Sequence, residues 1–135
     1  MGRRMAHAFY ATLRKTDSAL LIGTDCPSLT CADLKEAGRV LRQNNHAVIG
    51  PAEDGGYVLL GLHQVAADLF EGVSWGTESV LEETRERFRN LNWRWDELPE
   101  RWDVDRPEDV NRLMSEGFLQ RLPEMIQGRF PFSRR

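Results

Sequence analysis

The chain has 135 residues, of which 41% are hydrophobic and 29% are charged. These are the proportions of a globular protein about one domain in size, and they exclude a wholly disordered, collagen-like or low-complexity chain. Eighteen basic and 21 acidic residues give a formal charge of −3. We therefore expect neither nucleic acid nor an anionic membrane as a partner, and no apolar run reaches the roughly 18–20 residues of a membrane span.

Neither the N-terminus nor the cysteines indicate secretion. No apolar segment follows the basic residues Arg3 and Arg4, whereas a signal peptide requires one. Two cysteines, Cys26 and Cys31, are fewer than a secreted disulfide scaffold of this size carries, and the intervening Pro27 makes a local bridge awkward. The three histidines are scattered and lack the clustered spacing of a zinc site. We expect a cytoplasmic protein with reduced thiols.

The first part of the chain carries a strand signal and then a helix signal. Residues 18–23 contain the apolar run 19–22, which is typical of a strand buried on both faces. Thr30 begins a helix, because Asp33 three residues later completes an acidic version of the capping box. The Gln-Asn-Asn run at 43–45 ends this helix.

Two further strands follow, separated by a tight turn. Residues 47–49 form a short apolar strand that the Gly-Pro pair at 50–51 stops. Asp-Gly-Gly at 54–56 is a turn signal, since glycine accepts positive φ, and residues 57–60 form the third strand. Residues 65–70 predict a short helix.

The remainder predicts a helix, a strand and a last helix. Thr77 is expected to cap the first of these helices, and residues 92–98 suit a strand with Trp93 and Trp95 on one side. Pro107 begins the last helix, because proline at the first helical position loses no hydrogen bond.

This order of elements predicts an α/β fold, with a mainly parallel, mixed sheet flanked by helices. The turn at Asp54 is expected to add one antiparallel strand to that sheet. The pattern weakens after Gly117. We expect one domain over residues 1–135, in which residues 117–135 form a C-terminal tail.

Three acidic loops lie beside the predicted strand ends and helix starts, at 23–27, 51–57 and 103–109. Ligands of open α/β sheets bind beyond the carboxyl ends of the strands, where a carboxylate can hold Mg²⁺ together with phosphate oxygens. Asp25 and Asp105 are candidates to bind one divalent metal from two distant positions in the chain. For each loop alone, turn formation or helix capping is the better explanation, so the metal hypothesis depends on all three together.

The amino-acid sequences of these loops resemble those of one bacterial family. The runs Leu-Ile-Gly-Thr-Asp-Cys-Pro-Ser-Leu at 21–29 and Ile-Gly-Pro-Ala-Glu-Asp-Gly-Gly-Tyr-Val-Leu-Leu-Gly-Leu at 49–62, with the segments at 69–77 and 103–109, are similar to its signatures. It is the uncharacterised glycosyltransferase-like family, also called rSAM/selenodomain-associated transferase, and the resemblance covers about residues 2–114. The family resembles GT-A nucleotide-diphospho-sugar transferases, a superfamily that includes molybdenum-cofactor nucleotidyltransferases and phospholactate guanylyltransferase.

The resemblance implies roles for particular residues. Asp25 and Asp105 match ligands of Mg²⁺ or Mn²⁺, which bridges nucleotide phosphates in the related enzymes. Asp54 is the candidate catalytic residue, in a loop facing the acceptor substrate. The candidate substrate-binding residues are Thr24, Gly55, Gly56, Trp75 and Thr77. Stacking of Trp75 on a base or sugar competes with a plain core role for its large apolar ring.

Two departures from the family pattern matter. Arg106 stands where the family has a threonine, which removes a helix-capping hydroxyl, so we expect Asp105 or Asp103 to cap instead. Family members also begin with a strand and a Lys/Arg-rich loop that resembles the one gripping nucleotide phosphates. The chain shows no counterpart of that loop and no other glycine-rich phosphate motif. We expect the N-terminal nucleotide-binding part to be absent.

These observations favour a metal-dependent nucleotidyl- or glycosyltransferase-like domain with a nucleotide or nucleotide sugar as donor, although the missing loop argues against turnover. The alternative is a non-catalytic remnant or interaction domain, which forms a homo-oligomer to cover an exposed sheet edge. A haloacid-dehalogenase-like phosphatase is disfavoured, because the second aspartate that it needs after Asp25 is replaced by Pro27.

Overall fold

A computed structural model describes residues 1–117, except for the side chain of Ala67. The chain divides into two compact units, residues 1–103 and residues 104–135, and each is described by itself. The expected tail at 117–135 lies outside the described residues after its first position. Within residues 1–117, no helix has the length and apolar character needed to cross a membrane.

The helices and strands follow the predicted order. The first unit contains α1 (Gly2–Leu13), β1 (Ala19–Ile22), α2 (Cys31–Arg42), β2 (Ala47–Pro51), β3 (Tyr57–Leu62), the 3₁₀ turn η1 (Ala67–Leu69), α3 (Val80–Asn90) and β4 (Trp95–Glu97); the second contains α4 (Pro107–Ser115). Three details differ from the sequence expectations. The helix at 65–70 is a single 3₁₀ turn, β4 is shorter than 92–98, and Ser79 rather than Thr77 is the N-cap of α3.

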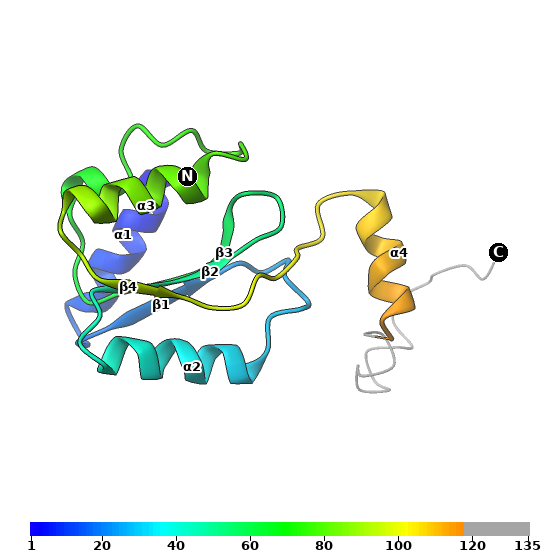
Figure 1. Cartoon of the computed structure of the whole chain (residues 1–135), viewed down its shortest axis with the longest axis horizontal. Coiled ribbons are helices and arrows are strands. Elements are labelled where there is room, and N and C mark those ends of the chain that lie inside the picture. Colours follow the sequence, from blue (N-terminus) through cyan, green and yellow to red (C-terminus); the bar gives the residue numbers. More distant parts are fainter. Residues whose placement is uncertain (118–135) are drawn as a thin grey trace. The chain divides into compact units, whose positions relative to one another are not determined.

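The four strands form one sheet in the order β1-β3-β2-β4 (Figure 1). β3 is antiparallel to both of its neighbours, and β2 pairs with β4 in parallel. β1, β2 and β4 therefore run in one direction and β3 alone runs in the other. This confirms the predicted α/β class and the single antiparallel strand after the turn at Asp54. Because β3 lies inside the sheet, it nevertheless makes two of the three pairings antiparallel.

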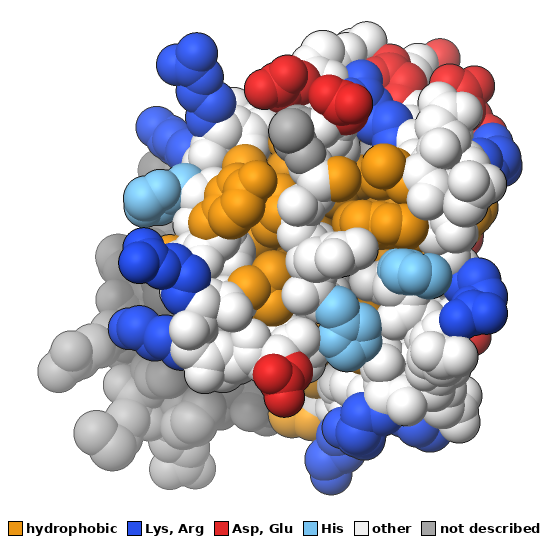
Figure 2. Space-filling model, turned by 90° about the vertical axis from the view of Figure 1, so that its left-hand side faces the viewer, with side chains coloured by type: hydrophobic (Ala, Val, Ile, Leu, Met, Phe, Trp, Pro, Cys, Tyr) orange, Lys and Arg blue, Asp and Glu red, His pale blue; other side chains and the backbone are white. Residues whose placement is uncertain are grey.

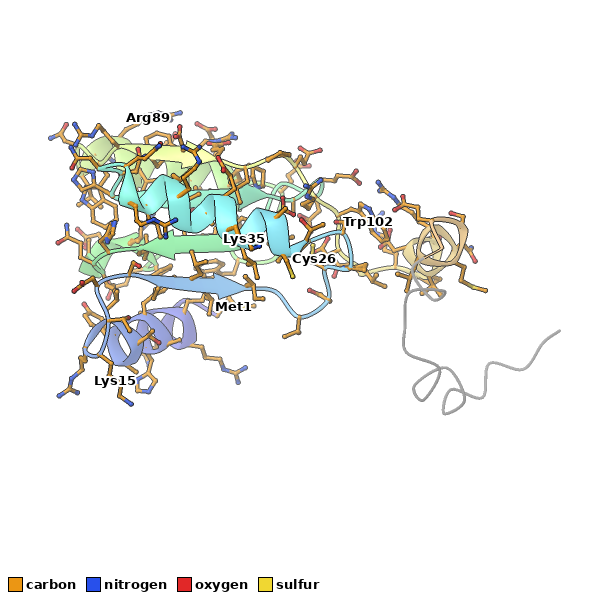
Figure 3. All side chains as sticks on the ribbon, turned by 90° about the horizontal axis from the view of Figure 1, so that it is seen from below. Met1, Lys15, Cys26, Lys35, Arg89 and Trp102 are labelled. Atoms are coloured by element: carbon orange, nitrogen blue, oxygen red, sulfur yellow. The ribbon has the colours of Figure 1, made fainter. Side chains whose placement is uncertain are left out.

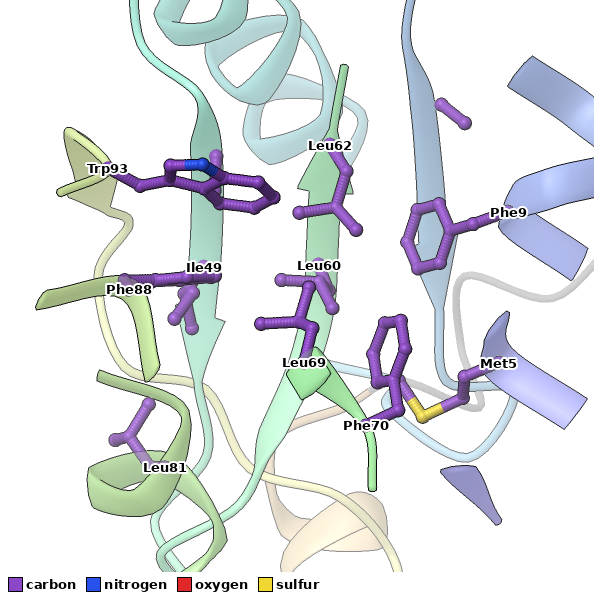
Figure 4. Packing of buried hydrophobic residues seen from close by; sticks show 12 residues of the cluster. Met5, Phe9, Ile49, Leu60, Leu62, Leu69, Phe70, Leu81, Phe88 and Trp93 are labelled. Carbon is purple, nitrogen blue, oxygen red and sulfur yellow. The ribbon is translucent and has the colours of Figure 1, made fainter. Parts of the chain in front are cut away.

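Helices cover both faces of the sheet, with α1 and α3 on one side and α2 on the other (Figure 1). The larger core cluster lies under α1 and α3 (Figure 4). In it the rings of Phe9 and Phe70 stack at 5.9 Å, and Phe88 contacts both Trp93 and Trp95 at 5.7 and 5.4 Å. The two tryptophans thus share one side of their segment, as predicted.

A glycine near the end of β3 allows dense packing on the α2 face. A Cβ atom at Gly61 would lie 2.6 Å from side-chain atoms of both Leu20 and Val48, and 3.0 Å from Leu41 of α2. Helix α2 contacts β2 and β3, and at the neighbouring edge strand β1 the side chains of Leu20 and Ile22 are 38% and 45% exposed. This edge is therefore less covered than the middle of the sheet.

Acidic side chains at the third helical position cap two helices. In α2, the Thr30 N–H donates to Asp33 Oδ2 at 2.9 Å and the Asp33 N–H donates to Thr30 Oγ1 at 3.2 Å, which confirms the predicted capping box. In α4, Asp109 Oδ2 accepts from the N–H groups of Asp105 and Arg106 at 3.0 and 2.8 Å. These two bonds hold the pKa of Asp109 below its usual value. Arg106 is the N-cap of α4 and Asp109 is the acidic residue that accepts the N–H groups before the helix, while capping by Asp105 or Asp103 stays a prediction.

Candidate functional site

The loops that follow β1, β2 and β4 meet at one end of the sheet. The Gly23 N–H donates to the Val58 carbonyl at 2.9 Å, which extends the pairing of β1 with β3 by one residue. Toward the other edge of the sheet, the segment after β4 pairs with the segment after β2. The Arg101 N–H donates to the Pro51 carbonyl at 2.9 Å and the Arg101 carbonyl accepts from the Glu53 N–H at 3.0 Å. The loops at 23–27 and 51–57 and the segment from Arg101 to Asp103 therefore lie at the same end of the sheet.

Asp25 and Asp103 come together at this end. Each offers a carboxylate oxygen, and these two atoms lie within 4.8 Å of each other. Asp25 is exposed and Asp103 is half-buried. Asp105 is the partner of Asp25 that the sequence predicts, and within the first unit Asp103 lies beside Asp25. Asp105 follows two residues later, in the second unit.

The loop after β1, which carries Cys26, lies beside the segment after β4, which carries Trp102 (Figure 3), and hydrogen bonds to Trp102 join the two. Ser28 Oγ accepts from the Trp102 N–H at 3.0 Å and donates to the Trp102 carbonyl at 2.9 Å. The Cys26 thiol donates to the same carbonyl at 3.3 Å, and Cys26 and Cys31 are both free thiols. Trp102 is buried. The residue directly before Asp103 is thus fixed to the loop that carries Asp25.

A bidentate ion pair fixes the preceding residue to the start of α2. Arg101 donates from Nε to Asp33 Oδ2 at 3.0 Å and from Nη2 to Asp33 Oδ1 at 2.8 Å. The Asp33 side chain is 8% exposed and that of Arg101 30%. The hydrogen bonds from Arg101 are the largest of the effects that hold the pKa of Asp33 below its usual value. Asp33 therefore caps α2 and also holds the segment that leads to Asp103.

The Asp54 turn packs against the start of α3. Gly55 has φ of +88°, and a Cβ atom there would lie 2.3 Å from the Glu78 carbonyl oxygen. The Gly55 carbonyl accepts from the Leu81 N–H at 2.9 Å, and Asp54 Oδ1 accepts from the Gly56 N–H at 3.0 Å. The sequence interpretation connected these glycines with close approach to a ligand, and the structure shows a close approach of Gly55 to Glu78. Asp54 itself is exposed.

The remaining candidate substrate-binding residues, which are Trp75, Thr77 and Thr24, differ in what they contact. Trp75 is half-buried and packs against the larger core cluster, which is the plain core role weighed above. Thr77 Oγ1 donates to the Ser74 carbonyl at 2.6 Å and accepts from the Ser79 N–H at 3.3 Å. Thr24 is exposed beside Asp25. The structure brings the Thr77 turn next to Gly55 through Glu78, and the substrate roles of these residues remain predictions.

At the opposite end of the sheet, the surface that faces the viewer in Figure 2 carries histidine side chains. An open hollow of about 410 Å³ there is lined by polar side chains that include His46 and His63. The ring nitrogens of His63 lie 2.9 and 2.8 Å from the carbonyl oxygens of Asp17 and Leu41. His46 Nδ1 accepts from the Arg94 N–H at 2.9 Å. These imidazoles hold backbone segments in place, and the carboxylate pair lies at the other end.

Comparison with known proteins identifies the family and the fold. Residues 1–77 match a family described as uncharacterized proteins conserved in bacteria (DUF2064). The chain is also similar to the crystal structure of a "putative nucleotide-diphospho-sugar transferase" from Desulfovibrio desulfuricans G20, with a TM-score of 0.79 and 35% sequence identity. That match covers 87% of this chain and 52% of the other, so the chain spans about half the length of this relative. No curated protein matches. The chain belongs to the bacterial DUF2064 family, and its mixed α/β sheet is similar to that of a GT-A-like, nucleotide-diphospho-sugar transferase fold, as its motifs predicted.

Proposed function

We propose that this chain is a metal-dependent, transferase-like domain that binds the diphosphate of a nucleotide or nucleotide sugar at the Asp25–Asp103 end of the sheet. The observation that carries the proposal is the pairing of two carboxylates, from the loops after β1 and β4, within 4.8 Å. The similarity to a protein described as a nucleotide-diphospho-sugar transferase supports the class of donor. We place the protein in the cytoplasm, in keeping with its free thiols.

The residues fit a hard divalent cation. Carboxylate oxygens are the ligands that Mg²⁺ and Mn²⁺ prefer, and two ligands of one Mg²⁺ lie about 3–4 Å apart. An upper limit of 4.8 Å therefore requires at most a small rotation of either side chain. On the resemblance, we propose Asp105 as a further ligand. A bound cation would neutralise charge on the donor phosphates during group transfer.

The chain's own residues are proposed to orient the reactants. Asp25 and Asp103 hold the donor diphosphate through the cation, and Thr24 lies beside them. Asp54 is proposed as the catalytic residue of the acceptor loop, which Gly55 and Gly56 shape. Trp75 and Thr77 are retained as candidate substrate contacts, because the Gly55 contact with Glu78 brings their segment beside the Asp54 turn.

The metal proposal is tested by replacing Asp25 with asparagine and measuring Mn²⁺ binding by calorimetry and electron paramagnetic resonance. We expect at least a tenfold loss of affinity, since the loss even of a residue that only supports a metal ligand typically costs 10–100-fold. Asp17→Asn is the matched control, because Asp17 is also exposed but precedes β1 at the opposite end of the strand. Binding of a nucleotide sugar or nucleoside triphosphate is then measured with and without Mn²⁺. A folded wild-type protein that binds neither metal nor nucleotide would contradict the proposal.

A second candidate function is that of an interaction domain that associates with another copy of itself through β1. The observation that favours it is the edge position of β1 in the described sheet, together with the exposure of Leu20 and Ile22. Edge strands with apolar side chains pair readily with other chains, and lysine blocks such pairing. We expect the wild type to be a dimer by light scattering and Ile22→Lys to be a monomer. Asp96→Lys on β4 is the control at the other edge, and a monomeric wild type at micromolar concentration counts against this function.

A further inference from the structure

We infer that Ser28 is a positioning residue for the cation site, because its hydroxyl holds the backbone before Asp103 against the loop of Asp25. The inference rests on the proposed function to the extent that the Asp25–Asp103 pair binds a cation. It concerns a residue that contributes no ligand, since Ser28 acts on the pair only through Trp102.

Strand pairing alone does not bring the two carboxylates together. β1 and β4 lie at the two edges of the described sheet, with β3 and β2 between them. Neighbouring strands are about 4.8 Å apart, so three such steps separate β1 from β4 by about 14 Å. The carboxylate oxygens nevertheless lie within 4.8 Å of each other. The two loops must therefore cross the ends of the inner strands and be held there by contacts of their own.

The Ser28 hydroxyl supplies the stronger part of that contact. It bonds both the N–H and the carbonyl of one residue, Trp102, at 3.0 and 2.9 Å. Two bonds to the same residue fix its peptide groups in position and in orientation, much as a β-bridge does. The Cys26 thiol donates to the same carbonyl at 3.3 Å, and thiols are weaker donors than hydroxyls. Loss of the hydroxyl would leave the N–H of a buried residue without this acceptor.

Both loops are fixed at their far ends, so the Ser28 contact decides the geometry between them. The Asp33–Arg101 ion pair fixes the residue before Trp102 to the first turn of α2. The Gly23–Val58 hydrogen bond fixes the start of the other loop to β3. Between these two points, the side chain of Ser28 makes two hydrogen bonds that join the loop of Asp25 to the residue preceding Asp103.

The test compares Ser28→Ala with Ser28→Thr in the full chain, using the Mn²⁺ dissociation constant from electron paramagnetic resonance. We expect Ser28→Ala to weaken Mn²⁺ binding by about tenfold, in the range found for residues that support metal ligands, and Ser28→Thr to restore it by keeping the hydroxyl. Leu62→Val is the matched control, because Leu62 is fully buried at the opposite end of β3. It should lower thermal stability without changing Mn²⁺ affinity. Wild-type affinity in Ser28→Ala would overturn the inference and leave the proposed function intact.

Hydrogen exchange distinguishes a failure of the Ser28 inference from a failure of the proposed function. We expect the Trp102 amide to exchange faster in Ser28→Ala than in the wild type, and Ser28→Thr to retain protection. If the wild type binds no Mn²⁺, the proposed function fails, and this exchange measurement still decides whether Ser28 holds the segment. Unchanged protection of Trp102 in Ser28→Ala would refute the positioning role by itself.

Discussion

Replacing Asp33 with alanine is expected to lower the free energy of unfolding by about 3 kcal/mol, because a buried carboxylate with an ion pair and a helix cap is lost together. The change leaves Arg101 without its bidentate partner and the Thr30 N–H without its acceptor. Urea unfolding at pH 7 measures the effect. Glu36→Ala is the matched control on the same helix, because Glu36 pairs with Arg39 on an exposed surface, where such pairs contribute little to stability.

The stability difference between the wild type and Asp33→Ala is also expected to depend on pH. Asp33 has a pKa below its ordinary value of 3.8 in the folded chain, so its contribution is complete above that value and is lost as the pH falls through the lower, folded-state pKa. The stability difference between wild type and Asp33→Ala should therefore be constant at neutral pH and shrink below about pH 4. A difference that stays the same down to pH 3 would show that the carboxylate charge is not what stabilises the fold.

Gly55→Ala is expected to destabilise the protein by more than about 3 kcal/mol, whereas Gly76→Ala costs only about 1 kcal/mol. Both glycines have positive φ, at +88° and +77°, so the cost of the backbone conformation is common to both. They differ in space, because a Cβ at Gly55 meets the backbone of Glu78 at 2.3 Å and a Cβ at Gly76 meets nothing within 4 Å. The difference between the two variants in urea unfolding therefore isolates the contact between the Asp54 turn and α3. Equal stabilities would contradict that contact.

The elements were predictable because their signals are local. The capping box of α2, proline at the first position of α4 and the Asp-Gly-Gly turn each lie within a few residues, and all occur where they were expected. The antiparallel placement of β3 followed from its short connection to β2. The position of β3 between β1 and β2 did not follow, because the order of strands in a sheet depends on contacts between distant segments.

In the candidate site, too, only the residues with a local sequence signal were predictable. Asp25 was found from the sequence because it directly follows a buried strand. The sequence points to Asp105 rather than Asp103, since Asp105 matches the family motif and nothing in the local sequence shows that Ser28 bonds to Trp102. At the start of α4, the family motif directs attention to the residue before Pro107, whereas the carboxylate of Asp109, two residues after Pro107, accepts the N–H groups of Asp105 and Arg106.

Side chains from elsewhere in the chain hold helix α2 at both of its termini. Its first turn is joined to Arg101, and near its end the Val40 carbonyl accepts from the Asn45 side chain at 3.0 Å while His63 Nε2 lies 2.8 Å from the Leu41 carbonyl. Helices usually fray from their ends, where carbonyl and N–H groups lack partners. With both ends tied, α2 can open only when more distant parts of the first unit separate from it, so its amides should exchange through cooperative unfolding of that unit.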